Sequence, residues 1–344
     1  MTMASRLVHP LLQQLPAELH AALVAKGCNL AQAVHIERLS HGLSNQNYRI
    51  ATREREFALR INSDASNTLC SRHSEVQLWR SAAQASIAPQ LYYVSDDYRY
   101  YLSEFILNTV DWGQLMSINH CEPQPVNPVC QTAHQSLLSL LQGLKALPVP
   151  DNAISVAQQW HEYFDKLSLL SGQIEGSLGQ RPAWLTRFEL LKRHEPRVQQ
   201  LLDILAGCMV APQFSHRDLN PYNLLLSGDR LWCIDYEYAC SSHPLVDLAS
   251  VLATHKLSGW QRQWLIAHYL QDHSKLNGAA FNAVPAAIEL YWYFALCWAL
   301  LMQGESLVNE VKVAFTADVK VPNLTADYLE YFDQFLQCIA AKGC

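Results

Sequence analysis

Three side chains suited to phosphoryl transfer, those of Asp218, Asn223 and Asp235, lie close together in the C-terminal half of the sequence. His216, Asp218 and Asn223 form an H-x-D-x-x-x-x-N pattern, and Asp235 follows 17 residues after Asp218. Phosphoryl transfer from ATP needs a carboxylate at the acceptor hydroxyl and oxygen ligands for magnesium, which this pattern supplies when a strand-end aspartate follows it. The spacing predicts such chemistry. A lone H-x-D more often marks a capped turn, but that alternative leaves Asn223 and Asp235 unexplained.

Two short apolar runs separate this loop from Asp235. Residues 223–226 and 231–234 have the composition of strands, and residues 227–230, Ser-Gly-Asp-Arg, have the composition of a turn. We expect a tight hairpin here, because such a hairpin returns Asp235 to the neighbourhood of Asp218.

The N-terminal half contains short runs of alternating polarity. They predict an antiparallel meander with the order three strands, a helix and two strands, at residues 33–39, 47–52, 57–62, 68–85, 91–94 and 100–106. After a Pro-rich loop at 121–128, helical periodicity predicts helices at residues 129–148, 160–170, 182–206, 257–272 and 284–307. The expected fold class is α+β.

Composition excludes several classes of protein. The 344 residues include 25 basic and 31 acidic side chains, a formal net charge of -6, which argues against sequence-independent binding of nucleic acid. The ten cysteines are widely spaced and contain no C-x-x-C pair, so we expect reduced thiols in a cytoplasmic protein. Residues 1–16 lack a signal-peptide core, and the apolar segment 290–302 is too short to span a membrane and is interpreted as a buried helix.

Several further motifs accompany the loop. They are His41-Gly-Leu-Ser-Asn45, Ala58-Leu-Arg-Ile61, Ala88-Pro-Gln-Leu-Tyr92, Ser103-Glu-Phe-Ile106, Ile234-Asp-Tyr-Glu-Tyr238 and Asp247-Leu-Ala249. Together they resemble the choline/ethanolamine kinase branch of the aminoglycoside-phosphotransferase-like small-molecule kinases, over about residues 33 to 310. The resemblance implies a protein-kinase-like fold of two lobes. We expect an N-terminal helical extension at 1–32, a nucleotide-binding sheet lobe at 33–107 and a helical lobe with the catalytic loop and acceptor pocket at 108–344.

The resemblance also implies roles for single residues. Asp218 would accept or orient the proton of the acceptor hydroxyl, while Asn223 and Asp235 would hold Mg²⁺ against the phosphates of ATP. His216 and Asp247 would have structural roles in ordering the loop. The remaining nucleotide contacts would come from Arg60 paired with Glu75, from the turn residues Ser44 and Asn45, and from the hinge residues Glu104, Phe105 and Ile106.

The acceptor is less closely defined. The resemblance implies an acceptor pocket with Glu237, Tyr238, Trp292 and Trp298 as candidates. Aromatic faces such as those of the last three attract quaternary ammonium groups. Any one of these aromatic residues could instead belong to a helical core. Choline kinases carry an acidic residue seven positions beyond the equivalent of Asp247, where this chain has Thr254. The expected acceptor is an amino alcohol such as choline or ethanolamine. Thiamine, another alcohol or an aminoglycoside remains an alternative, as does a catalytically silent kinase-like binding module.

Overall fold

The computed structural model describes residues 15–25, 35–39, 45–53, 55–62, 71–107, 110–118, 127–174, 181–315 and 328–341. These residues form two compact units. The first unit takes its residues from 1–150, 216–240 and 254–261, and the second takes its residues from 151–215, 241–253 and 262–344.

A five-stranded sheet lies in the first unit. Its strand order is β1-β2-β3-β5-β4, and every neighbouring pair is antiparallel. The elements are β1 (His35–Leu39), β2 (Gln46–Ala51), β3 (Glu56–Ile61), α3 (Arg72–Gln84), β4 (Leu91–Val94) and β5 (Tyr100–Glu104). The predicted order of three strands, a helix and two strands is confirmed.

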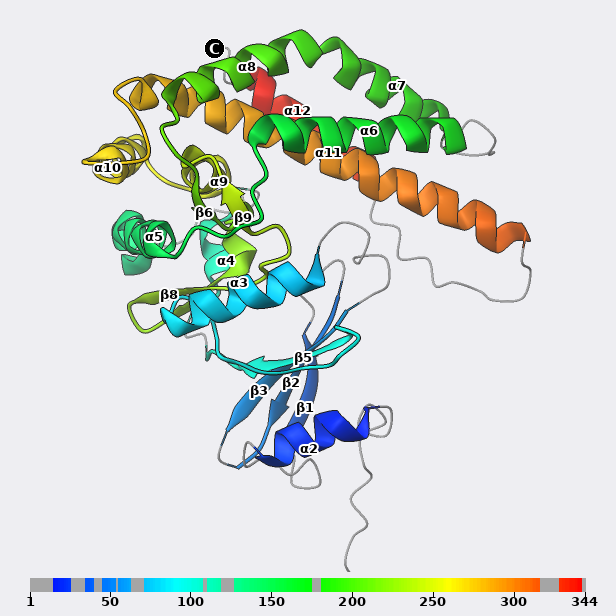
Figure 1. Cartoon of the computed structure of the whole chain (residues 1–344), viewed down its shortest axis with the longest axis vertical. Helices are drawn as coiled ribbons and strands as arrows, with labels where there is room; N and C mark the ends of the chain where they lie inside the picture. Colours follow the sequence, from blue (N-terminus) through cyan, green and yellow to red (C-terminus); the bar gives the residue numbers. More distant parts are fainter. Residues whose placement is uncertain are drawn as a thin grey trace, which may run out of the picture. The chain divides into compact units, whose positions relative to one another are not determined.

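One face of this sheet is apolar and packs against helix α2 (Ala17–Ala25) (Figure 1). The helix contributes Leu19 and Leu23 to a buried cluster whose sheet members are Ile50, Phe57, Leu59 and Leu102. Because successive residues of a strand point to opposite faces, the side chain of Arg60 must point away from α2.

The opposite face carries Arg60 and lies against α3. Arg60 and Tyr101 are partners in the register of β3 and β5. Trp79 of α3 packs edge-on against Tyr101, with 6.1 Å between ring centroids. The alternation of the strand therefore delivers a guanidinium to the space between the sheet and α3.

The predicted hairpin after the H-x-D loop is present in the first unit. Strands β7 (Leu224–Ser227) and β8 (Arg230–Cys233) pair in register from Leu224 with Cys233 to Ser227 with Arg230. Gly228 opens the two-residue turn with a φ of 64°, a left-handed conformation that glycine adopts without steric cost. Helices α4 (Trp112–Met116) and α5 (Pro128–Ala146) complete the described part of this unit.

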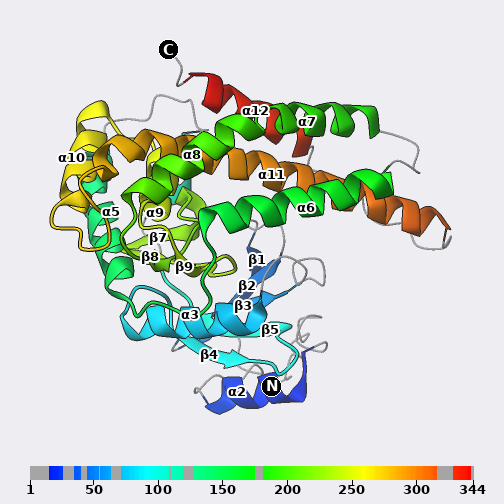
Figure 2. The same cartoon turned by 45° about the horizontal axis from the view of Figure 1, so that its top comes forward.

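The second unit is mostly helical. Helix α11 (Ala280–Phe315) packs against four other helices, and Figure 2 shows them along its length. These are α6 (Val156–Ile174), α7 (Arg181–Arg193), α8 (Glu195–Cys208) and α12 (Tyr328–Ala340). The unit also contains α9 (Leu245–Thr254) and α10 (Gly259–Leu270) at least in part, and the short strands β6 (Gln213–Ser215) and β9 (Cys240–Ser242) pair with each other.

The apolar part of α11 is a core helix of this unit. Residues 280–308 are long and apolar enough to cross a membrane by length and composition, but 67% of the most apolar window is buried inside the protein. This burial agrees with the predicted buried helix around residues 290–302.

One helix prediction was wrong. Residues 182–206 form two helices, α7 and α8, which are separated at His194. Pro196 explains the break, because proline suits the first turn of a helix and cannot donate the backbone hydrogen bond that a continuous helix needs there.

A buried neutral histidine joins two elements of the second unit. The Nε2 atom of His243 donates to the carbonyl of Leu205 at 3.0 Å, and Nδ1 accepts from the backbone N–H of Leu245 at 3.1 Å. His243 is only 2% exposed, and burial lowers its pKa from the ordinary 6.5 to about 4. Both ring nitrogens are thus used in the neutral form.

We predict that this histidine makes the protein less stable in mild acid. The unfolded chain takes up a proton on this imidazole below about pH 6.5 while the folded chain resists protonation down to about pH 4. The contribution of His243 to the free energy of unfolding should therefore be full above pH 6.5 and fall by about 2 kcal/mol between pH 7.5 and pH 5. Urea denaturation at several pH values measures this fall.

The control is His268→Gln, at an exposed histidine of α10. This variant should keep the pH dependence of the wild type, whereas His243→Gln should be less stable at pH 7.5 and decline less on acidification. An unchanged decline in His243→Gln would contradict the prediction.

Candidate active site

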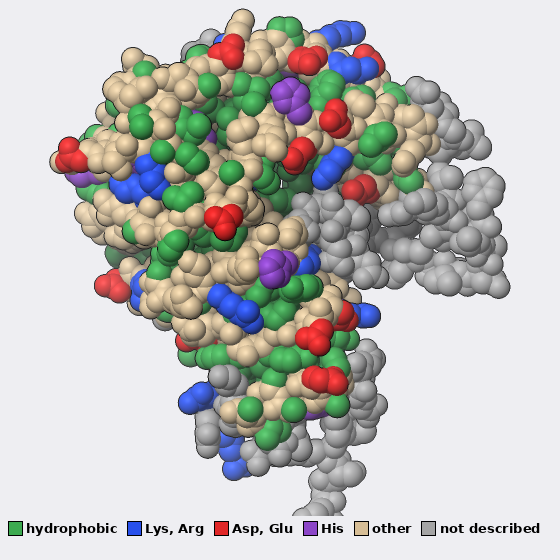
Figure 3. All heavy atoms as spheres, viewed as in Figure 1, with side chains coloured by type: hydrophobic (Ala, Val, Ile, Leu, Met, Phe, Trp, Pro, Cys, Tyr) green, Lys and Arg blue, Asp and Glu red, His purple; other side chains and the backbone are tan. Residues whose placement is uncertain are grey.

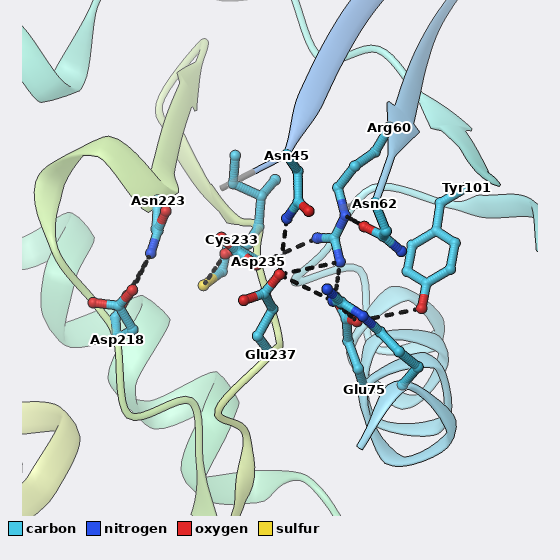
Figure 4. Close-up of polar contacts among 12 residues, drawn as sticks. Asn45, Arg60, Asn62, Glu75, Tyr101, Asp218, Asn223, Cys233, Asp235 and Glu237 are labelled. Carbon is cyan, nitrogen blue, oxygen red and sulfur yellow. Dashed lines mark hydrogen bonds and ion pairs between the residues drawn. The ribbon is translucent and has the colours of Figure 1, made fainter. Parts of the chain in front are cut away.

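The catalytic-loop candidate Asp218 is held by two amide side chains. Asn223 Nδ2 donates to Asp218 Oδ2 at 2.8 Å and to the Asp218 carbonyl at 2.9 Å, while Asn220 Nδ2 donates to Asp218 Oδ1 at 2.8 Å. A single 3-10 turn, η3 (Pro221–Asn223), brings Asn223 back to the aspartate. Figure 4 shows the Asn223 nitrogen toward Asp218 and its carboxamide oxygen pointing away.

His216 connects this loop to the residue before Asp235. Its Nε2 donates to the carbonyl of Ile234 at 3.1 Å, and its Nδ1 accepts from the backbone N–H of Asp218 at 3.3 Å. Burial lowers the pKa of His216 to about 4, so the ring is neutral as both bonds require. The Ile234 N–H in turn donates to the Asn223 carbonyl at 3.0 Å. The His216 imidazole and the backbone N–H and carbonyl of Ile234 thus set the spacing of Asp218 and Asp235.

Two residues of this region have left-handed backbone. Arg217 and Asp235 both have φ at 69°, a conformation that costs a residue with a Cβ atom roughly 1–3 kcal/mol and persists only when the surroundings hold it. They flank the clamp made by His216, on the residue before Asp218 and on Asp235 itself. The strain is therefore located where the two carboxylates are aimed.

A cluster of buried charges surrounds Asp235 in the same unit (Figure 4). Arg60 Nε donates to Asn62 Oδ1 at 2.7 Å, its Nη1 lies 3.3 Å from Asp235 Oδ1, and its Nη2 pairs with Glu75 Oε1. The guanidinium also lies 4.8 Å from the ring centroid of Tyr101. Arg60 thus bridges the helix carboxylate of Glu75 and the strand-end carboxylate of Asp235, and its predicted pairing with Glu75 is present.

Glu237 and Arg72 complete this cluster. Glu237 Oε1 accepts from Asn45 Nδ2 at 2.8 Å and from Arg72 Nη1 at 3.0 Å, and it lies 3.6 Å from Arg60 Nη2. The sequence interpretation missed Arg72. Its signal was the three-residue spacing from Glu75, which places both side chains on one face of a helix.

Burial and neighbouring negative charge favour the binding of a proton or a metal cation at the carboxylates of Asp218 and Asp235. Burial raises the pKa of Asp218, and the hydrogen bonds from Asn220 and Asn223 oppose that rise. Burial also raises the pKa of Asp235, Glu237 beside it adds to the rise, and Arg60 opposes it. Glu75, Asp235 and Glu237 each offer an oxygen, and these oxygens lie within 4.8 Å of one another. The site therefore concentrates negative charge that two guanidinium groups compensate only in part.

The donor set fits a magnesium ion. Asp235 and Glu237 supply carboxylate oxygens, the hard ligands that Mg²⁺ prefers. The Asn223 nitrogen is committed to Asp218, which leaves the carboxamide oxygen as the ligand atom that this side chain can offer.

The other predicted nucleotide residues have the following positions. Ser44 lies outside the described residues. At the predicted hinge, the N–H of Glu104 donates to the Gln90 carbonyl at 2.8 Å, and that of Phe105 donates to the Glu56 carbonyl at 3.4 Å. Ile106 is buried, and no hydrogen bond of its N–H is found among the described residues.

The predicted acceptor residues are distributed over both units. Tyr238 follows Glu237 in the first unit and is half-buried. Trp292 and Trp298 lie in the second unit, where their rings contact α12 through Phe335 and Tyr328, each at 5.6 Å between centroids. Helix α12 was not predicted from the sequence. The tryptophans thus have packing partners in the helical core, and their role toward an acceptor stays a prediction.

The sequence match that decides the family covers most of the chain. A family model described as "Phosphotransferase enzyme family" matches residues 35–279. The chain belongs to this family. The match spans the sheet, the H-x-D loop, the hairpin and Asp235, so the predicted assignment to the small-molecule kinases is confirmed.

Known proteins similar to this phosphotransferase agree with the assignment. Protein LicA of Haemophilus influenzae is 23% identical over 73% of this chain and 67% of its own length. Choline kinase LicA from Streptococcus pneumoniae superposes with a TM-score of 0.61 at 16% identity, covering 94% of this chain and all of the other. A choline/ethanolamine kinase family protein from Mesorhizobium loti has a TM-score of 0.59 at 20% identity, covering 95% and 94%. A structure of LicA in complex with AMP has a TM-score of 0.59 at 14% identity, covering 94% and 97%. The predicted protein-kinase-like α+β fold is confirmed.

We predict that Arg60 is a main electrostatic support of this site. Arg60→Met should lower the free energy of unfolding by about 3–5 kcal/mol, because it leaves the fully buried Glu75 carboxylate without one of its two guanidinium partners. Equilibrium urea denaturation measures the change.

The matched control is Arg49→Met on the neighbouring strand β2. Arg49 pairs with Glu56 at 2.7 Å, but its side chain is 30% exposed, so this change should cost about 1 kcal/mol or less. Equal losses in the two variants would show that Arg60 has no special part in the cluster.

Proposed function

We propose that this phosphotransferase moves the γ-phosphoryl group of ATP to the hydroxyl of a small amino alcohol, with choline or ethanolamine as the first candidates. The observation that carries the proposal is the juxtaposition of Asp218, Asn223 and Asp235, which His216 and Ile234 hold in one unit. The similar LicA choline kinase and the complex of LicA with AMP support the acceptor and nucleotide classes.

Asp218 is the residue for the acceptor proton. Its carboxylate is fixed by two amides that donate to it, and the rise in its pKa makes it a stronger proton acceptor than an exposed aspartate. In this role Asp218 orients the acceptor hydroxyl and takes its proton as the oxygen bonds to phosphorus. At the same time the bond between the γ-phosphorus of ATP and its bridging oxygen breaks, and ADP is the leaving group.

Asn223 and Asp235 are the predicted ligands of Mg²⁺, and the structure adds Glu237 to the candidates. A bound magnesium ion would neutralise negative charge on the β- and γ-phosphates. Arg60 supplies a fixed positive charge beside Asp235, and Asn45 presents its amide from the start of β2. These groups and Ser44 form the proposed phosphate side of the site, with Glu75 positioning Arg60.

The hinge is the proposed adenine side. Because the N–H groups of Glu104 and Phe105 already donate within the sheet, Ile106 offers the N–H for adenine in this proposal. Glu104 and Phe105 then hold the hinge rather than contact the base. The lobe boundary near residue 107 and the helical extension at residues 1–32 are also part of the proposal, and of the extension the structure describes residues 15–25.

The residues proposed for the acceptor are Tyr238 of the first unit and Trp292 and Trp298 of the second. Thr254 offers a hydroxyl where choline kinases carry a carboxylate, and it lies 3.2 Å from His255 Nδ1. Trp112 Nε1 donates to His255 Nε2 at 3.1 Å, which requires a neutral imidazole. Because this network is neutral and lacks that carboxylate, the candidate acceptors beyond choline are ethanolamine, thiamine, other alcohols and aminoglycosides.

The distribution of charged side chains on the surface is also compatible with a small-molecule acceptor. The face in Figure 3 shows acidic and basic side chains interspersed among hydrophobic and other groups, and the net charge is -6. We propose that the enzyme acts in the cytoplasm without nucleic-acid partners or membrane insertion. Six described cysteines are free thiols, which suits a reducing compartment.

The proposal predicts that Asp218→Ala lowers kcat at least about 100-fold, because the variant lacks the proton acceptor. The measurement is coupled release of ADP with Mg²⁺ over a panel of choline, ethanolamine, thiamine, sugars, homoserine and aminoglycosides. Binding of nucleotide, followed by the rise in melting temperature, should be retained in the variant.

The matched control is Asp229→Ala, at an exposed aspartate in the turn of the same region. It should keep the wild-type rate. A wild-type rate in Asp218→Ala would refute the mechanism, and nucleotide binding without turnover on any acceptor would favour a silent binding module.

A further inference from the structure

Arg72 is a buried cation that has no role in the reaction proposed above. Its side chain is 6% exposed, and one atom, Nη1, donates to Glu75 Oε2 at 2.7 Å and to Glu237 Oε1 at 3.0 Å. Arg72 therefore links helix α3 to the chain segment that follows Asp235.

The place of Arg72 in its helix is locally unfavourable. Ser71 is the N-cap of α3 and accepts from the N–H of Ser74, so Arg72 occupies the first helical position. The N-terminal end of a helix carries partial positive charge and therefore disfavours a cation. The two carboxylates that Arg72 contacts account for its presence there.

The contacts of Arg72 orient Glu237. Asn45, Arg72 and Arg60 all approach the same oxygen, Oε1, at 2.8, 3.0 and 3.6 Å. Within the described part of the chain, no hydrogen bond to Oε2 is found. Two hydrogen bonds and one ion pair on the same oxygen orient the carboxylate and leave the second oxygen for a ligand.

We propose that Arg72 is a positioning residue that aims Glu237 Oε2 at the divalent cation of the active site. The inference rests on the proposed function and deepens it, because it adds the group that orients a metal ligand. Arg72 also holds Glu75 Oε2, so that Oε1 of Glu75 remains for Arg60. Hydrogen-bond partners of this kind commonly change metal affinity by about 10- to 100-fold.

The test measures binding of Mn²⁺ alone to the whole protein, by the electron paramagnetic resonance signal of the free ion. Arg72→Gln should weaken Mn²⁺ binding about 10- to 100-fold. Arg72→Lys keeps the charge but presents a single nitrogen, and it should weaken binding by a smaller factor. In turnover assays, both variants should need more Mg²⁺ for half-maximal rate while the KM for the acceptor stays unchanged.

The control is Arg80→Gln, at an exposed arginine of the same helix. It should bind Mn²⁺ as the wild type does. Circular dichroism verifies that each variant is folded, and if Arg72→Gln does not fold, Arg72→Lys decides.

The outcomes separate this inference from the proposed function. Wild-type Mn²⁺ binding in the folded Arg72 variants, together with weak binding in Asp235→Asn, would overturn the role of Arg72 and leave the proposed metal site intact. Wild-type binding in Asp235→Asn would overturn the metal site itself, and the role of Arg72 with it.

Discussion

The site depends on keeping several carboxylates close together, with the side chains of Glu75 and Glu237 buried and that of Asp235 partly exposed. Glu75, Asp235 and Glu237 would repel one another at the distances observed, and burial makes that repulsion stronger than it would be in water. Arg60 and Arg72 oppose the repulsion, because Arg60 lies between Glu75 and Asp235 while Arg72 lies between Glu75 and Glu237. The fold is arranged to deliver these two cations. Strand alternation turns Arg60 to the α3 face, and the N-cap of α3 places Arg72 and Glu75 one turn apart.

A second constraint is the fixed distance between Asp218 and Asp235, which the neutral imidazole of His216 maintains. His216 donates to Ile234 and accepts from Asp218, so a protonated ring would lose one of these two bonds. The low pKa of His216 keeps the ring neutral at physiological pH. The left-handed residues Arg217 and Asp235 show that the backbone is strained around this clamp. The hairpin and the imidazole together hold Asp235 and Arg217 in a conformation that such residues rarely adopt, and positioning of this kind is the main contribution of a protein to phosphoryl transfer.

The chemistry was more predictable from the sequence than the packing. The spacing of His216, Asp218 and Asn223 and the hairpin to Asp235 are local features, and the order of strands and helix along the N-terminal half followed from alternation. Arg72 was not predicted, because its meaning depends on Glu237, 165 positions away, meeting the same helix face. The break at His194 was missed, since the apolar periodicity continues through it and only Pro196 signals a new helix. Trp292 and Trp298 were ambiguous for a physical reason, because aromatic pockets and aromatic cores use the same residues.

The residues proposed for phosphoryl transfer and the tryptophans proposed for the acceptor belong to different units, which matters for how acceptor preference can evolve. Every described residue proposed here for proton acceptance, metal ligation or phosphate binding belongs to the first unit, whose hydrogen bonds fix their mutual geometry. Trp292 and Trp298 belong to the second unit and pack on α12. The hydrogen bonds described above for Arg60, Arg72 and His216 are made to residues of the first unit. In the proposed arrangement, a change at the tryptophans alters acceptor preference without replacing a residue of the phosphoryl-transfer site, whereas a change at Tyr238 falls directly beside Glu237.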